Sequence, residues 1–413
     1  MEIILKYGIV FFSIAVFIVL ALGVFAMARG DSFNKNWSQK GGNATHVMKH
    51  IQLGDSPKII WEQNIGDGET DGVSLTATPI VLDNKVVTLD TSGRVRAFRL
   101  RSGELQWETN LKPNEKDGAF GGGLGSGQNK VFISLGSGEL VCLSIKDGKE
   151  LWRTSTGRAL RSAPSYADGR IFVTSLDNKA LAFSAISGNK LWTHNGMMAN
   201  AALLGAASPV INNNAVIVAY SSGELYALKA DNGRVFWGDN LSGRRGTIGA
   251  ARISHIRGNP VVDQNIVIAT SHSGRVTALE FKTGKRLWDL PVTSKTMPWV
   301  VGDYLYIVSI GGQVVCITKR DGRIKWVINL PEFRQKKIIG LKKAKIPVEY
   351  SEPVLAGDRL IIASSIGKIY SVSPYTGEIL GETQLDNGVF IEPIVADKTL
   401  LLLDREGKLI AFR

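Results

Sequence analysis

Residues 138–152 read GELVCLSIKDGKELW, which is an apolar strand, a tight turn at Asp147-Gly148 and a second strand ending on Trp152. Glycine supplies the positive φ that a tight hairpin turn needs. The same pattern returns along the chain without any slip in register. It opens on glycine or, once, on asparagine, at Gly93, Gly138, Asn178, Gly223, Gly274, Gly312, Gly367 and Gly407. The sequence therefore contains eight copies of one unit.

Two further positions keep the register of the repeat. The fifth position of each copy is small: Ala97, Cys142, Ala182, Ala227, Ala278, Cys316, Ser371 and Ala411. Six copies place a tryptophan fourteen residues after the opening position, and the seventh has Gly381 there; the tryptophans are Trp107, Trp152, Trp192, Trp237, Trp288 and Trp326. We predict that these tryptophans dock between adjacent repeats, where each indole N–H reaches a backbone acceptor.

Another strand precedes each unit and is usually introduced by proline, which a strand tolerates at its first residue. The prolines are Pro79, Pro164, Pro209, Pro260, Pro298, Pro353 and Pro393, with Gly123 taking this place in the second copy. Four strands in a unit of about 40 to 55 residues is the pattern of a propeller blade. We therefore predict an all-β fold, an eight-bladed β-propeller with four-stranded antiparallel blades, over residues 58–413.

The eighth copy is incomplete, because its tryptophan would fall beyond Arg413. Trp61 lies in an equivalent strand, residues 58–65, that has no unit of its own. We predict that this N-terminal strand pairs with the C-terminal strand, residues 408–412. The pairing would close the ring and remove two exposed strand edges.

The N-terminus has a different character. An uncharged apolar run spans residues 8–25, with Lys6 before it and Ala26-Met27-Ala28 after it. This pattern predicts either a cleaved signal peptide or an uncleaved membrane anchor over residues 1–28, and both would deliver the remainder outside the cytoplasm. No cysteine lies near residue 28, so a cysteine-linked lipoprotein is not expected. Residues 29–57 are predicted to form an irregular segment.

The formal net charge is +12, which is typical of a protein that binds nucleic acid, an anionic membrane surface or an acidic protein partner. Because the chain is predicted to be exported from the cytoplasm, nucleic acid is not expected as its partner. Much of the excess is local, since six basic residues fall within twelve positions: Arg334, Lys336, Lys337, Lys342, Lys343 and Lys345. This stretch is interpreted as a solvated loop, with a role in partner binding as the alternative.

Few residues in the sequence are candidates for a disulfide, a metal site or catalysis. Cys142 and Cys316 occupy the small slot of the second and sixth blades, on opposite sides of a ring, so they are predicted to be core residues without a disulfide. His46 and His50 have no acidic neighbour close in sequence, which disfavours zinc. The glycines at 121–123 are predicted to pack closely at the propeller axis. We predict no catalytic residue, no cofactor and no metal site.

The unequal connections between blades are more informative. The intervals between opening positions are longest before Gly274 and before Gly367, and connections of this kind all emerge on one face. Apolar residues, extra length and basic charge on one face indicate a surface for a partner. The predicted partner-binding residues are Leu203, Leu204, Arg252, His255, Arg257, Lys336 and Lys337.

These repeats resemble the tryptophan-docking motifs of pyrroloquinoline-quinone-type propellers, as in residues 147–152 and 283–288. The entry at residues 36–43, NWSQKGGN, and the order of the blades resemble the family of outer-membrane protein assembly factors called BamB. The resemblance implies a non-enzymatic, periplasmic scaffold. It further implies binding to the periplasmic domains of the barrel-assembly protein BamA, help in inserting outer-membrane proteins, contact with unfolded outer-membrane proteins, and a monomer within a hetero-complex.

The chain departs from this family in three places. Leu203-Leu204-Gly205 keeps the leucine of a family contact region but lacks its arginine before the glycine. Arg252, His255 and Arg257 stand where the family carries acidic residues. The family's lipid-bearing cysteine is missing, so anchoring would come from the hydrophobic segment or from the partner.

Two other functions share the repeat. One is a ligand-binding or sensor module, and the other is a quinone-dependent dehydrogenase. Such enzymes are longer and usually carry adjacent cysteines, which this sequence lacks. A thermal shift or dye reduction after adding quinone and calcium would separate them from a scaffold.

Overall fold

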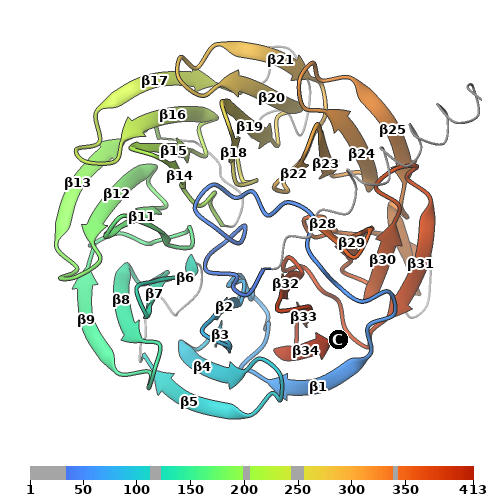
Figure 1. Cartoon of the computed structure of the whole chain (residues 1–413), viewed down its shortest axis with the longest axis horizontal. Coiled ribbons are helices and arrows are strands. Elements are labelled where there is room, and N and C mark those ends of the chain that lie inside the picture. Colours follow the sequence, from blue (N-terminus) through green and yellow to red (C-terminus); the bar gives the residue numbers. More distant parts are fainter. Residues whose placement is uncertain (1–33, 112–121, 199–204, 243–254, 338–342) are drawn as a thin grey trace, which may run out of the picture.

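The computed structural model shows eight four-stranded antiparallel sheets arranged as blades around one axis, as predicted (Figure 1). The residues it describes are 34–111, 122–198, 205–242, 255–337 and 343–413. The predicted signal peptide or anchor at residues 1–28 lies outside these ranges. Within them, no helix has the length and apolar character needed to cross a membrane.

The strands of a blade run outward from the axis in chain order (Figure 1). Blade 1 contains β2 (Ile80–Leu82), β3 (Lys85–Leu89), β4 (Arg94–Arg99) and β5 (Leu105–Asn110). Blade 2 contains β6 (Gly122–Gly127), β7 (Lys130–Leu135), β8 (Glu139–Ser144) and β9 (Glu150–Ser155). Blade 3 contains β10 (Ser165–Ala167), β11 (Arg170–Thr174), β12 (Lys179–Ser184) and β13 (Lys190–Asn195). Blade 4 contains β14 (Val210–Asn212), β15 (Ala215–Ala219), β16 (Glu224–Lys229) and β17 (Val235–Asn240).

The second half follows the same order. Blade 5 contains β18 (Val261–Asp263), β19 (Ile266–Ser271), β20 (Arg275–Glu280) and β21 (Arg286–Leu290). Blade 6 contains β22 (Trp299–Val301), β23 (Tyr304–Val308), β24 (Gln313–Thr318) and β25 (Ile324–Asn329). Blade 7 contains β28 (Val354–Ala356), β29 (Arg359–Ala363), β30 (Lys368–Val372) and β31 (Ile379–Gln384). Blade 8 contains β32 (Ile394–Ala396), β33 (Thr399–Leu403), β34 (Lys408–Phe412) and β1 (Ile59–Asn64).

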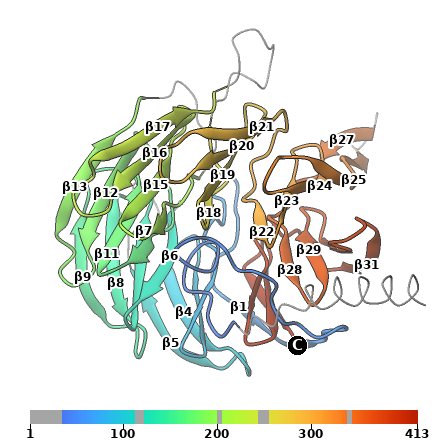
Figure 2. The ribbon, with the colours of Figure 1, turned by 45° about the horizontal axis from the view of Figure 1, so that its top comes forward.

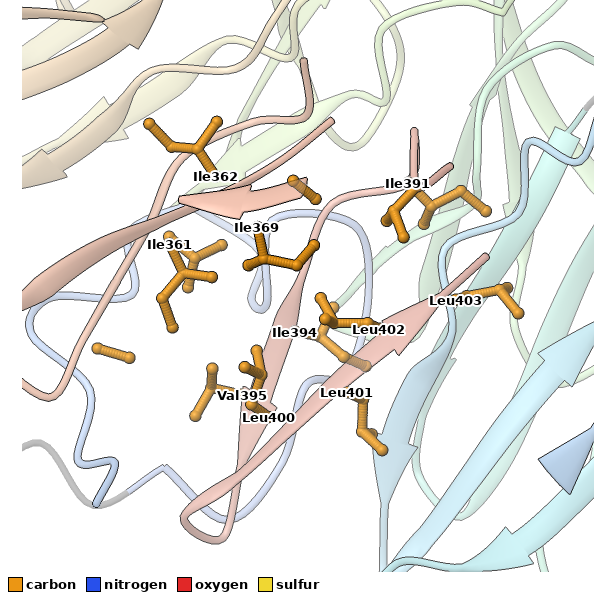
Figure 3. Close-up of a cluster of buried hydrophobic side chains, with 14 of the residues drawn as sticks. Ile361, Ile362, Ile369, Ile391, Ile394, Val395, Leu400, Leu401, Leu402 and Leu403 are labelled. Atoms are coloured by element: carbon orange, nitrogen blue, oxygen red, sulfur yellow. The ribbon is translucent and has the colours of Figure 1, made fainter. Parts of the chain in front are cut away.

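The core lies between the faces of neighbouring blades. Every residue of β33 is buried, whereas every residue of the outermost strand β31 is exposed. A strand sandwiched between two blades must be apolar on both of its faces, which explains the continuous run Leu400–Leu403. Figure 3 shows these leucines beside Ile394 and Val395 of blade 8 and Ile361, Ile362 and Ile369 of blade 7.

The predicted closure of the ring is confirmed. β1 pairs with β34 in antiparallel register, with Trp61 opposite Ala411 and Asn64 opposite Lys408. Beyond the strands, Lys58 and Arg413 exchange two backbone hydrogen bonds of 3.0 and 2.9 Å. Blade 8 is thus built from both ends of the propeller, and β34 is paired on both of its edges, by β33 and by β1.

Tryptophan clasps hold adjacent blades together, as predicted. Each indole N–H donates to a backbone carbonyl of the next blade; for example, Trp107 Nε1 lies 3.0 Å from the Ile145 oxygen. The other donors are Trp61, Trp152, Trp192, Trp237, Trp288 and Trp326. The turn glycine of the next blade lies against the indole, since a Cβ on Gly148 would be 2.5 Å from Trp107. The same repeated motif therefore provides the tryptophan of one blade and the turn glycine of the next blade against which that tryptophan packs.

The N-terminal segment, residues 34–53, forms an irregular circlet around the inside of the ring (Figure 1). It bonds to the innermost strand, or to the turn that follows it, in every blade. The order is blade 8, then blades 1 to 7, through Asn34–Asp397, Trp37–Val81, Gln39–Gly125, Gln39–Tyr166, Ala44–Ile211, Thr45–Val262, Lys49–Trp299 and Ile51–Ala356. The sequence predicted its irregular conformation but did not indicate its path.

Other expectations about buried groups also hold. Cys142 and Cys316 are free and buried, in blades 2 and 6. Of the glycines at 121–123, Gly121 lies outside the described residues. Gly122 and Gly123 pack closely, because a Cβ on them would lie 2.1 Å from the Ser134 carbonyl oxygen and 2.8 Å from the Ala163 Cβ, respectively. These positions admit no larger side chain without a shift of the backbone.

Candidate functional site

The connection face is the side of the ring where the outermost strand of one blade leads into the innermost strand of the next. Two connections are long, residues 241–260 between blades 4 and 5 and residues 330–353 between blades 6 and 7. The second carries an additional hairpin, β26 (Phe333–Lys337) and β27 (Lys343–Pro347). In Figure 2 this hairpin lies on the side of the ring opposite to the circlet.

The basic stretch is therefore a strand pair where the sequence predicted a loop. β26 and β27 pair over five positions, from Phe333 opposite Pro347 to Lys337 opposite Lys343. A backbone bond of 2.9 Å between Val348 and Glu332 closes its base. Lysine-rich segments have low strand propensity, so the pattern gave no strand signal; the local partner strand supplies the hydrogen bonds that stabilise it. Residues 333–347 hold six of the basic residues and no acidic one.

The other predicted partner-binding residues are distributed unevenly. Leu203, Leu204 and Arg252 lie outside the described residues. His255 is only 2% exposed, so its side chain is buried inside the connection. Its backbone carbonyl accepts a 3.0 Å bond from the backbone N–H of His272. Arg257 lies near the axis beside Gly205: its Nε is 3.6 Å from the position that a Cβ would occupy if residue 205 were not glycine.

A cup opens on the connection face around the axis, with a volume of about 450 Å³. Its walls come from the connections, and Lys40 of the circlet also lines it. In seven blades the residue three positions before the strand-opening proline or its equivalent reaches the cup: Thr76, Arg161, Ala206, Arg257, Lys295, Tyr350 and Phe390. We call this set the mouth ring. The regular repeat thus brings together residues that are far apart in sequence.

A buried charge cluster fastens the circlet to the cup. Lys40 Nζ lies 3.2 Å from a carboxylate oxygen of Glu392 and 3.5 Å from one of Glu352. Burial lowers the pKa of Lys40, but the two carboxylates outweigh burial and leave the pKa above its usual value. Burial raises the pKa of Glu392 to about 7, against the opposing effect of Lys40. The ammonium therefore stays charged between the two carboxyl groups.

His46 of the circlet is buried in a neutral form. Its Nδ1 lies 2.8 Å from the Pro260 carbonyl oxygen, and its side chain has almost no exposure. Burial lowers the pKa of His46 to about 4; the hydrogen bond to Pro260 opposes this, and the charge of Lys40 adds to it. The neutral imidazole thus donates its Nδ1 proton to the Pro260 carbonyl oxygen. Among the described residues there is no group of three or more His, Cys, Asp or Glu side chains placed to hold a metal ion.

We expect acid to destabilise the ring through His46. Below pH 6.5 the unfolded chain binds a proton at this histidine that the folded chain refuses until about pH 4. Stability is therefore present above pH 6.5 and lost as the pH falls towards 4, by up to about 3 kcal/mol. Urea unfolding at pH 7.5 and 4.5 measures this for the unmodified chain and for His46→Gln, which does not titrate.

The comparison between the two proteins isolates His46, because Glu392 titrates in both. His46→Gln is expected to be less stable at pH 7.5 but to lose less stability on acidification. Equal losses in the two proteins would contradict the role given to His46.

The repeats and their indole clasps define the class of protein, a β-propeller built from PQQ-like repeats. A family profile described as outer membrane protein assembly factor BamB matches residues 54–120 and 91–328. The chain belongs to the BamB family of outer membrane protein assembly factors.

Relatives in this family match over most of the chain. The BamB protein of Shewanella oneidensis is 26% identical over 368 residues, covering 87% of this chain and 89% of that protein. The BamB protein of Escherichia coli K12 is 25% identical over 360 residues, covering 85% and 88%.

Solved structures with the same fold include two kinds of protein. BamB from Moraxella catarrhalis has a TM-score of 0.73 at 17% identity, covering 87% of this chain and all of that one. A europium-containing methanol dehydrogenase has a TM-score of 0.74 at 12% identity, covering 92% and 98%. At these identities the likeness shows the fold alone. Function must be argued from the family and from the connection face.

Proposed function

We propose that this protein is a non-enzymatic scaffold of the outer-membrane β-barrel assembly machinery. It acts in the periplasm and binds the periplasmic domains of the barrel-assembly protein BamA, assisting the insertion of outer-membrane proteins. The observation that carries the proposal is the family match across residues 54–328, which covers the ring from its N-terminal closure strand to blade 6. Residues 1–28 serve as its signal peptide or membrane anchor.

The partner surface in this proposal is the connection face. Its apolar contribution is assigned to Leu203 and Leu204, which precede Gly205 in the sequence. Its cationic contribution comes from Arg252 and Arg257 and from the hairpin lysines, Lys336 and Lys337. Buried apolar anchors supply most of the affinity of an interface, while surrounding charges steer association. The six basic residues of the hairpin favour an acidic partner surface.

The proposal is tested by recovering partners on the tagged full-length chain. We expect it to retain the BamA periplasmic domains from envelope extracts of the source organism. Leu203→Asp with Leu204→Asp should reduce recovery at least about tenfold, because a carboxylate at an apolar anchor must be desolvated on binding. Quantitative immunoblotting of the eluate measures the loss.

Leu151→Asp is the matched control. Leu151 is half exposed at the start of β9, the outermost strand of blade 2, whose other end leads to the connection face, so this variant should bind normally. Failure of the unmodified chain to recover any barrel-assembly component would remove the proposal. An equal loss with Leu151→Asp would remove the connection face as the binding surface.

A further inference from the structure

The mouth ring of the cup is charged on one side only. Blades 3, 5 and 6 contribute Arg161, Arg257 and Lys295, whereas blades 1 and 4 contribute the small residues Thr76 and Ala206. The fold therefore tolerates a small side chain at this position and does not itself require arginine or lysine. Three cations along one arc need an explanation other than the packing of the ring.

The acidic side of the cup is already neutralised from within. Glu352 and Glu392 of blades 7 and 8 hold Lys40, which the circlet brings into the cup. On the opposite arc the backbone places two guanidinium groups around blade 4. Arg161 accepts a 3.2 Å bond from the Ala206 N–H through its carbonyl, and Arg257 Nε lies near Gly205.

The formal charge of the lining is positive. Five cationic residues line the cup, Lys40, Arg161, Arg257, Lys295 and Arg405. They face four carboxyl groups, Glu69, Glu349 and Glu352 of the lining and Glu392 behind Lys40, and Arg405 is paired with Glu69 at 2.6 Å. Lys295 Nζ lies 2.6 Å from Glu349, but that carboxylate is half exposed, and an ion pair in contact with water contributes little stability. An entering anion can therefore compete for Lys295 at small cost.

The histidines around the cup respond to the same positive charge. Burial, together with the neighbouring charge of Arg257, lowers the pKa of His255 to about 4. Burial also lowers the pKa of His272, together with the charges of Lys295 and Arg257. Two nitrogens of the Arg161 guanidinium, Nε and Nη1, are buried, and this burial lowers the pKa of Arg161 as well. A partly desolvated guanidinium binds an anion more strongly than one in free solution.

We propose that the axial cup binds a small polyanion that carries carboxylate or phosphate groups, held by Arg161, Arg257 and Lys295. The volume of about 450 Å³ is that of a site for a metabolite-sized molecule. Guanidinium groups match carboxylate and phosphate oxygens with paired hydrogen bonds, and Lys295 adds a third positive charge. This function goes beyond that of a scaffold and does not depend on it, since the cup needs no protein partner.

Isothermal titration of the purified full-length chain with citrate and, separately, with pyrophosphate tests the proposal. We expect saturable binding of one equivalent of at least one of these anions, in a buffer whose ionic strength is matched with sodium chloride. The trimethyl ester of citrate should not bind. Arg257→Gln with Lys295→Gln should weaken binding at least about tenfold, because two charge-assisted hydrogen bonds are lost.

Arg323→Gln is the matched control, since Arg323 is highly exposed in the outer turn of blade 6. It should bind the anion like the unmodified chain. Urea unfolding of the double variant checks that the ring is intact, and single Lys295→Gln provides a milder change. No saturable binding of either anion, unchanged binding in the folded double variant, or an equal loss with Arg323→Gln would each overturn the proposal. The partner pull-down is a separate readout, so the two proposals can fail independently.

Discussion

Deletion of residues 403–413 is expected to abolish cooperative unfolding of the ring. The deletion removes β34, whose Leu409, Ile410, Ala411 and Phe412 are all buried. Burial of each large apolar side chain contributes about 1.5–3 kcal/mol, so the loss approaches the whole stability of an ordinary domain, about 5–15 kcal/mol. It also leaves β1 without its pairing strand. Thermal unfolding followed by circular dichroism should show no sharp transition.

Shortening the hairpin provides a control of similar size. Replacement of residues 334–346 by a short glycine turn removes β26 and β27, which pair only with each other. The melting temperature of this variant should stay within a few degrees of the original value. A deletion of residues 403–413 that melted at the original temperature would refute closure of the ring by the two ends of the propeller.

Trp107→Ala should destabilise the protein by about 3–5 kcal/mol, as truncation of a buried tryptophan does. Trp107 is 8% exposed, donates to the Ile145 carbonyl and lies against Gly148 of the next blade. Its removal opens a cavity between blades 1 and 2 and leaves that carbonyl without the indole donor. Urea unfolding measures the change.

Leu105→Ala tests the same strand without the clasp. Leu105 is half exposed on β5, two residues before the tryptophan, and its truncation should cost no more than about 0.5 kcal/mol. Similar losses for the two variants would show that the tryptophan does not hold the blades together.

The fold was predictable because the same strand-turn-strand pattern occurs eight times in the sequence. A single glycine-turn-tryptophan pattern is a weak signal, but a constant register across eight copies leaves few alternatives. The closure followed from one mismatch, a tryptophan at residue 61 without a unit and a unit at Gly407 without a tryptophan. Trp61 opposite Ala411 is the register that the other blades also use, as in Trp107 opposite Ala97.

The residues that line the cup were harder to predict from the sequence than the fold, although the sequence contained one relevant pattern. Arg161, Arg257 and Lys295 are more than a hundred residues apart at the extremes, and only the shared distance of three residues before each proline relates them. Arg257 was identified for its charge, but its position at the axis depends on the ring. Lys40 carried no signal at all, because an irregular segment has no period from which a path can be inferred.

The circlet begins at blade 8 and ends at blade 7, on either side of the interface where Gly381 takes the place of a tryptophan. Its bonding partners all lie later in the chain. A chain made from its N-terminus therefore produces the circlet first, and the circlet can complete its contacts only after the last blade has formed. Until then part of the circlet, which is some twenty residues long and includes Trp37, lacks native contacts and is exposed to chaperones and proteases.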